Sequence, residues 1–292
     1  SAGTAGEDTR AAALYGAGPA LIGLGQGLQR QPMGGNVIRV CALLPTICGN
    51  FAKPGAGLLY LSGAGQKGVD GDYLSAPHLS NCPESLSQMD LAAYLEKPEN
   101  ARAFLCWNIN PVASSPEQGR LMRAMSREDL FTVVLDIFAT DTTDYADYVL
   151  PAASFLEFDD LVSGYFNMSF SAQVKVAEPM GEALPNQEIF RRLARAMGFA
   201  EAELQESDAD IIATVVKGVG IEGGFAALKA KGTLFPKPEP QLQFADLNFP
   251  TASGKIEVAS AAAEADGHPR LPQAGVDAKP QGGRLRLITP AS

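Results

Sequence analysis

The chain has 292 residues, a hydrophobic content of 46% and a formal net charge of -10 at pH 7. This length and composition allow a sizeable core and predict more than one compact subregion. The acidic balance, without any basic cluster, disfavours nucleic acid or an anionic membrane as the partner, so we expect a small molecule or another protein.

The cysteine spacing and the length of the apolar runs disfavour disulfide-rich and membrane-spanning proteins. The four cysteines, Cys41, Cys48, Cys82 and Cys106, are too few and too irregularly spaced for a disulfide framework and form no Cys-x-x-Cys pair, so we assign no metal to them. No apolar run approaches the length of a membrane span, and the Gly/Ala-rich start lacks the basic head of a secretory signal. We expect no direct membrane insertion and a cytoplasmic location, with the periplasm left open.

The first third of the chain predicts helices and loops. In the Gly-rich residues 1 to 65, Asn36 should cap a helix that Pro45 kinks and Gly49 ends. Residues 66 to 100 lack clear periodicity and predict a long loop with a short helix near residues 85 to 95. Long loops of this kind are usually functional or mobile.

A strand, helix and strand follow in order. Residues 101–107 and 131–135 are short and apolar, as expected of strands covered on both faces. Between them Ser115 can cap a helix, Pro116 suits its first position, and Gln118 can complete a capping box. The pattern predicts an α/β fold, a Rossmann-like parallel sheet flanked by helices, with an α-rich N-terminal part and an irregular C-terminal connector.

Polar residues gather after both predicted strands. Ligands of open α/β sheets bind outside the carboxyl ends of the strands, and a capped helix start there can hold an anion. The candidate residues are Asn108, Asn110, Ser114, Ser115, Asp136, Thr140 and Thr142. The same residue types also serve ordinary turns and caps, and composition does not separate the two readings.

Other catalytic patterns are weaker. Glu157, Asp159 and Asp160 could form a general acid/base group, although a solvated loop is the preferred reading. The glycines near Gly16 and Gly23 lack the spacing of a dinucleotide fingerprint and follow no predicted strand. With only two histidines, and no phosphate loop, hydrolase chemistry has little support.

The last third predicts helices that give way to a connector. Asn186 should cap a helix that ends at Gly198, and further helices are expected at residues 208–217 and 224–231. Residues 249–258 fit a hairpin, and Gly/Pro/Ala-rich linker follows.

Several different short motifs follow one another along nearly the whole chain. They include Gly27-Leu28-Gln29-Arg30, Gly34-Gly35-Asn36, Pro54-Gly55-Ala56-Gly57, Asn108 to Pro111, Asp136-Ile137-Phe138, Leu150-Pro151 and Ser253 to Glu257. Their succession resembles the molybdopterin oxidoreductases related to dimethyl sulfoxide reductase and formate dehydrogenase. This resemblance implies an interior fragment of a longer catalytic subunit, without the N-terminal metal-ligand region and the C-terminal barrel domain.

The resemblance also implies three parts and a cofactor. Residues 1–65 would end one molybdopterin-binding α/β domain, residues 66–200 would form a βαβ cofactor-binding domain, and residues 201–292 would lead to a further domain. The cofactor would be bis-molybdopterin guanine dinucleotide with molybdenum or tungsten, and a 4Fe-4S iron-sulfur cluster would lie upstream. No metal ligand or catalytic residue is assigned in this chain, and the fragment alone is expected to be inactive.

Site roles follow from the same resemblance. Asn108, Asn110, Ser114 and Ser115 would meet a diphosphate, and Asp136 would meet guanine N–H groups or ribose hydroxyls. Thr140 and Thr142 would bind the same end, and Gln66 would lie in a loop near the pterin.

The full-length protein would perform two-electron or oxygen-atom-transfer chemistry on a small-molecule substrate, with an electron-transfer partner subunit. Two alternatives stay open: a non-catalytic scaffold such as the iron-sulfur subunit of respiratory NADH dehydrogenases, and a free-standing nucleotide-binding module.

Overall fold

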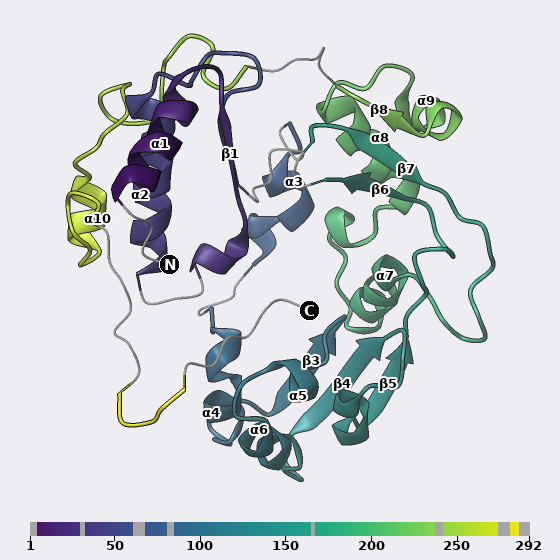
Figure 1. Ribbon diagram of the computed structural model, residues 1–292. Helices are drawn as coiled ribbons and strands as arrows, with labels where there is room; N and C mark the ends of the chain where they lie inside the picture. The colour runs from purple at the N-terminus through teal and green to yellow at the C-terminus, as the bar shows by residue number, and fades with distance from the viewer. Residues whose placement is uncertain are drawn as a thin grey trace. The chain divides into compact units, whose positions relative to one another are not determined.

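The computed structural model describes residues 5–29, 33–60, 68–80, 85–164, 167–236, 242–273 and 281–285 (Figure 1). The chain divides into two compact units. The first holds residues 1–66, 164–168 and 237–292, and the second holds residues 67–163 and 169–236. The C-terminal stretch therefore belongs with the N-terminal part. Within the described ranges, no helix is long and apolar enough to cross a bilayer.

The first unit contains a parallel pair of strands and three α-helices among its described residues. Its elements are α1 (Ala5–Gly16), β1 (Leu21–Leu24), η1 (Gln26–Gln29), α2 (Gly34–Ile47), β2 (Gly57–Tyr60) and α10 (Ala261–Ala265). In the β1–β2 pair, Leu21 lies opposite Gly57 and Leu24 lies opposite Tyr60.

The helix expected after Asn36 is present, but Asn36 does not cap it. α2 has Met33 as its N-cap without a side-chain cap, and Asn36 lies inside the first turn. A capping side chain must belong to the non-helical residue that precedes the first turn, so the prediction for Asn36 was wrong. The expected stop is confirmed: Cys48 is the C-cap, and Gly49 takes a left-handed φ of 62°.

The second unit contains the predicted strand, helix and strand. Its elements here are α4 (Leu91–Leu95), β3 (Ala103–Trp107), α5 (Pro111–Ser114), α6 (Gln118–Met125), β4 (Phe131–Asp136), η5 (Asp141–Tyr145) and β5 (Tyr148–Pro151). The three strands lie in the order β3-β4-β5, and both pairs are parallel (Figure 1). The predicted α/β fold with parallel strands flanked by helices is confirmed.

One face of this sheet is covered more fully than the other. α4 and α6 supply a core that includes Leu95, Leu121 and Met125, each at most 3% exposed. On the other face the ring of Trp107 meets Phe190 of α7 (Asn186–Ala196) edge-on at 5.0 Å. Leu105 and Trp107 remain 43% and 51% exposed, so the expectation that β3 is covered on both faces was wrong.

The second unit also contains an antiparallel sheet that the sequence pattern did not predict. Its strands, β6 (Asp160–Ser163), β7 (Phe170–Gln173) and β8 (Thr233–Leu234), lie in that order. α8 (Asp208–Gly218) and α9 (Gly224–Lys231) confirm the two predicted helices, and they share a buried cluster with β7. Its members include Phe170, Ile212, Val216 and Leu228. Four short helices complete the described elements of this unit: α3 (Gly71–Ser75), η3 (Pro77–Leu79), η4 (Gln88–Asp90) and η6 (Ala202–Leu204).

The predicted hairpin at residues 249–258 is a turn without strands. Its backbone closes through the Phe249 N–H, which donates to the Gly254 carbonyl at 3.0 Å. The Thr251 hydroxyl donates to the Lys255 carbonyl at 2.6 Å. Such local side-chain bonds to the backbone compete with a strand ladder, which explains why the ladder does not form.

Candidate functional site

The loops after β3 and β4 leave the same edge of the sheet. Trp107 pairs with Leu135, and the Asn108 N–H donates to the Leu135 carbonyl at 3.0 Å. Asn108 then takes a left-handed φ of 53°, which turns the chain sharply after the strand. Asn108 and Asp136 therefore begin two neighbouring loops, as expected for parallel strands.

Asn110 joins these two loops. Its Oδ1 accepts the Thr142 hydroxyl at 2.7 Å, and its Nδ2 donates to Oδ2 of Asp141 at 2.9 Å. The Thr142 oxygen accepts the Val112 N–H at 3.2 Å, and this threonine is fully buried. We call Asn110, Asp141 and Thr142 the loop latch, because their side chains tie the β3 loop to the β4 loop.

The helix after β3 begins at a different residue from the one predicted. Asn110 caps α5, where its Oδ1 also accepts the Ala113 N–H at 3.4 Å. Ser115 is the C-cap of this short helix, and α6 starts at Gln118 after Glu117 in a left-handed conformation. The expectation that Ser115 caps the helix was wrong, because the chain forms two helices where one was predicted.

The two serines of this loop differ in accessibility. The Ser114 hydroxyl is exposed and donates to the Asn110 carbonyl at 2.8 Å. Ser115 is buried, and its oxygen accepts the side-chain amide of Gln88 at 3.1 Å. Ser114 therefore retains access to solvent, whereas Ser115 is occupied within the protein.

Asp136 combines a turn-forming oxygen with an open one. Its Oδ1 accepts the N–H groups of Ile137 at 2.7 Å and Phe138 at 3.3 Å. No described residue donates a hydrogen bond to its Oδ2, and the side chain is half-buried. The carboxylate is thus oriented by its own loop while one oxygen stays available.

The neighbouring thiol of Cys106 is buried and bonded within the protein. Its side chain is 2% exposed and donates to the Ile109 carbonyl at 3.2 Å. Burial, together with the negative charge of Asp136, raises the pKa of this thiol to about 11. The group therefore stays protonated at neutral pH and is a poor nucleophile.

Thr140 carries a buried hydroxyl without a partner. Its carbonyl accepts the N–H and the hydroxyl of Thr143 at 2.9 and 2.6 Å. Its own Oγ1 is buried and has no hydrogen-bond partner within the described part of the chain. A buried polar group without a partner is costly, so this hydroxyl is a candidate for contact with a bound molecule. Gln66, the remaining candidate, lies outside the described residues.

The three carboxylates after β5 do not form a shared acid/base group. Glu157 accepts the N–H groups of Ser154 at 2.6 Å and Met180 at 3.1 Å, and these bonds, that of Ser154 foremost, lower its pKa. Asp159 pairs with Lys229 at 2.5 Å, which lowers its pKa. Burial raises the pKa of Asp160. Their separate partners favour structural roles for Glu157 and Asp159.

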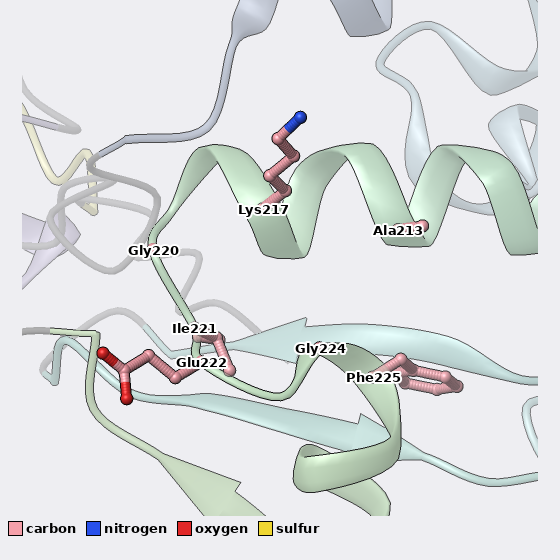
Figure 2. Close-up of a pocket in the computed structure, with 7 residues that line it drawn as sticks. All are labelled: Ala213, Lys217, Gly220, Ile221, Glu222, Gly224 and Phe225. Carbon is pink, nitrogen blue, oxygen red and sulfur yellow. The ribbon is translucent and has the colours of Figure 1, made fainter.

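A cavity of about 390 Å³ lies in a different part of the second unit, beside the connection between α8 and α9 (Figure 2). It is lined by Ala213, Lys217, Gly220, Ile221, Glu222, Gly224 and Phe225. Figure 2 shows the side chains of Lys217 and Glu222 pointing in different directions. Sequence reasoning missed this cavity, although the cluster of glycines from Gly220 to Gly224 is visible in the sequence.

The family model for molybdopterin oxidoreductases matches residues 4–196 of this chain. The chain therefore belongs to the molybdopterin oxidoreductase family. Membership implies a pterin cofactor that carries molybdenum or tungsten.

Individual relatives agree with this assignment. A probable oxidoreductase, YoaE of Bacillus subtilis, is 35% identical over 271 residues, covering 90% of this chain and 39% of the relative. A putative dimethyl sulfoxide reductase catalytic chain of Halobacterium salinarum is 29% identical, covering 94% of this chain and 33% of the relative. The chain therefore spans well under half the length of these relatives.

A solved structure supports the fold. Acetylene hydratase from Pelobacter acetylenicus matches with a TM-score of 0.52 and 23% identity, covering 64% of this chain and 26% of that one. The similarity shows the architecture and carries no statement about the reaction.

Proposed function

We propose that this chain is part of a longer molybdopterin-dependent oxidoreductase, in which it holds a guanine-dinucleotide arm of the cofactor. The site would be the edge of the sheet where β3 and β4 end. The observation that carries this proposal is the open Oδ2 of Asp136 beside Asn108, at the carboxyl ends of two neighbouring parallel strands. Ligands of open α/β sheets bind at such an edge.

The described residues fit a nucleotide. The open oxygen of Asp136 can accept guanine N–H groups or a ribose hydroxyl, and the unpartnered Thr140 hydroxyl can bond the same end. Asn108 is exposed, and its side-chain amide can donate to a diphosphate. The Ser114 hydroxyl is also exposed, and it would meet a diphosphate by exchanging its bond to the Asn110 carbonyl for one to a phosphate oxygen. Gln66 stays a candidate on the resemblance alone.

The buried candidates act differently in this proposal. Thr142 and Ser115 bond neighbouring protein groups, and Asn110 uses most of its bonding capacity within the loop latch. These three residues would hold the loops in shape, while Asn110 could also present its second amide hydrogen to a phosphate. When bound, the metal and pterin would supply the two-electron or oxygen-atom-transfer chemistry, and this chain's residues would bind and orient the nucleotide tail.

Three further statements belong to the same proposal. A 4Fe-4S cluster and an electron-transfer partner subunit would be associated with the full-length protein. Residues 1–292 alone would be inactive, because the residues that surround the metal would come from elsewhere. The three-part division at residues 65 and 200 would follow the family's domains.

The test uses the full-length protein with Asp136→Ala, and with Glu128→Gln as a control that changes an exposed carboxylate of the same unit. Molybdenum or tungsten content and the guanine nucleotide released on denaturation are measured. We expect the metal and the nucleotide in the unmodified protein and in the control, and a clear loss of nucleotide in Asp136→Ala.

Two results would count against the proposal. Protein that contains neither metal nor nucleotide would favour the non-catalytic scaffold, as in iron-sulfur subunits of respiratory NADH dehydrogenases. Full nucleotide retention by Asp136→Ala would remove the proposed site while leaving the family assignment intact.

A further inference from the structure

A segment without regular secondary structure, near the end of the described chain, is held on α2 by two side chains. We call residues 268–273 the strap. Arg39 donates from Nη1 to the Pro269 carbonyl at 2.7 Å and from Nη2 to the Arg270 carbonyl at 2.8 Å. Asn36 donates from Nδ2 to the Gln273 carbonyl and accepts the Gln273 N–H at 3.0 Å. All four hydrogen bonds join a side chain of α2 to a backbone group of the strap.

The positions of these two side chains suit this task. Asn36 and Arg39 are three residues apart on α2, so they project from the same face of the helix. Asn36 is only 5% exposed, although it is an amide near the start of a helix. Its side chain bonds both the N–H and the carbonyl of one residue, as a neighbouring strand would do. The pair therefore forms a backbone clamp.

The chemistry of the strap matches this clamp. Pro269 and Pro272 lack an N–H, so the strap offers more carbonyl acceptors than N–H donors. The guanidinium of Arg39 carries donors only and meets two of these carbonyls. Three of the four bonds therefore run from a donor on the helix to a carbonyl of the strap, and in the fourth the Gln273 N–H donates to Asn36.

The strap and α10 are connected to one another by further backbone bonds. The Arg270 carbonyl also accepts the Ser260 N–H at 3.0 Å, and the His268 N–H donates to the Ala263 carbonyl at 2.8 Å. The Ser260 side chain caps α10. The carbonyl of Arg270 is therefore shared between α2 and the residue that starts α10, so α10 and the strap should move together.

Apolar burial contributes little to this attachment. No residue in the described stretch 242–273 is buried, and Leu271 in the strap is 56% exposed. α10 likewise has no buried residue. Without a buried apolar contact, the backbone clamp formed by Asn36 and Arg39 is the main attachment of the strap to α2.

We infer that α10 and the strap form a releasable element, which detaches from α2 as one piece while β1, β2 and α2 remain folded. Asn36 and Arg39 are its positioning residues. The inference is independent of cofactor binding, because it rests only on contacts within the first unit.

Hydrogen exchange in the full-length protein tests this inference. The variants are Asn36→Ala and Arg39→Lys, which keeps the charge but loses the two-pronged donor. The controls are Gln26→Ala and Arg10→Lys, which alter an exposed amide and an exposed guanidinium of the same unit. We expect amides of residues 260–273 to exchange roughly tenfold faster in both variants than in the controls. Peptides from β1 and β2 should exchange at the unmodified rate.

A second measurement guards against general unfolding. Trypsin should cleave after Arg270 faster in Asn36→Ala than in Gln26→Ala, while the rest of the first unit stays intact. Unchanged exchange and cleavage in both variants would overturn the role of the clamp. Equal loss of protection in β1 and β2 would overturn independent release.

Discussion

The two units obtain their stability in different ways. In the second unit, aliphatic side chains of α4, α5 and α6 are buried in a common core that includes Leu121, and Val134 of β4 is also fully inaccessible. In the first unit, few side chains are buried, and segments distant in sequence are joined by side chains that bond the main chain. Apolar burial distributes stability over many residues, whereas hydrogen bonds from a few side chains to the main chain concentrate it in those few residues.

At the edge of β2, a side chain from a distant segment bonds the backbone of the strand. Gln243 accepts the Leu58 N–H at 3.2 Å and donates to the Leu58 carbonyl at 2.8 Å, so its amide imitates an adjacent strand. Such pairing protects a strand edge that would otherwise be open. An aromatic group of Phe51, Phe244 and Phe249, with ring centroids 4.5 to 5.8 Å apart, adds an apolar contribution nearby.

The largest expected effect is in the core of the second unit. Leu121→Ala removes a fully buried side chain and should lower the free energy of unfolding by about 2–5 kcal/mol. Urea unfolding measures this loss. Met122→Ala, at the adjacent exposed position, is the control and should change stability far less. Equal losses in the two variants would contradict a core centred on Leu121.

The next effect is at the β2 edge. Gly57 has a φ of 117°, and an added Cβ would lie 2.5 Å from Oε1 of Gln243. Gly57→Ala should therefore strain the backbone and displace the glutamine, at a cost of about 1–3 kcal/mol. Thermal unfolding measures it, with Gly25→Ala as control because no atom lies within 4 Å of its added Cβ. Similar stability in both variants would show that Gln243 does not fasten this edge.

A smaller effect is expected at the loop latch. Thr142→Val keeps the shape of the side chain but leaves the Val112 N–H and one lone pair of Asn110 without their partner. We expect a loss of about 1–3 kcal/mol, measured by urea unfolding. Thr142→Ser retains the hydroxyl and should lose less. If serine is as damaging as valine, the methyl group of Thr142 contributes as much as its hydrogen bonds, which would contradict the proposed role of the latch.

The smallest expected effect depends on pH. The pKa of Glu157 is lower in the folded protein because the Ser154 N–H stabilises its charge. Its contribution is therefore fully present above the ordinary carboxyl pKa and is lost as the pH falls through the folded value. Glu157→Gln should flatten the acid side of a stability profile measured by unfolding at several pH values. An unchanged profile, compared with Glu128→Gln, would contradict this linkage.

The sequence predicted the part of the fold that local patterns encode. Residues 103–107 and 131–135 are mostly apolar and are followed by the polar residues Asn108 and Asp136, so the strands and their shared edge could be anticipated. The exact start of the helix after β3 could not be anticipated. Ser115 and Gln118 match a capping box, but Gln88 occupies the Ser115 hydroxyl, and that contact crosses 27 residues of sequence.

Long-range polar contacts explain the other differences. Asn36 is of a residue type that often caps helices, yet its side chain bonds the backbone of Gln273, 237 residues away. The strands β6 and β7 have four residues each, too few to display a clear alternation. In the candidate site, the sequence indicated the polar loops, but only the geometry separates the open oxygen of Asp136 from the enclosed hydroxyl of Thr142.

Trp107 gives this chain a built-in optical reporter. It is the only tryptophan of the sequence, it ends β3 directly before Asn108, and its indole is half exposed against Phe190. Intrinsic emission excited selectively in the indole band therefore comes from the second unit alone. A change in the wavelength or the quenching of this emission would report events near Trp107, at the end of β3.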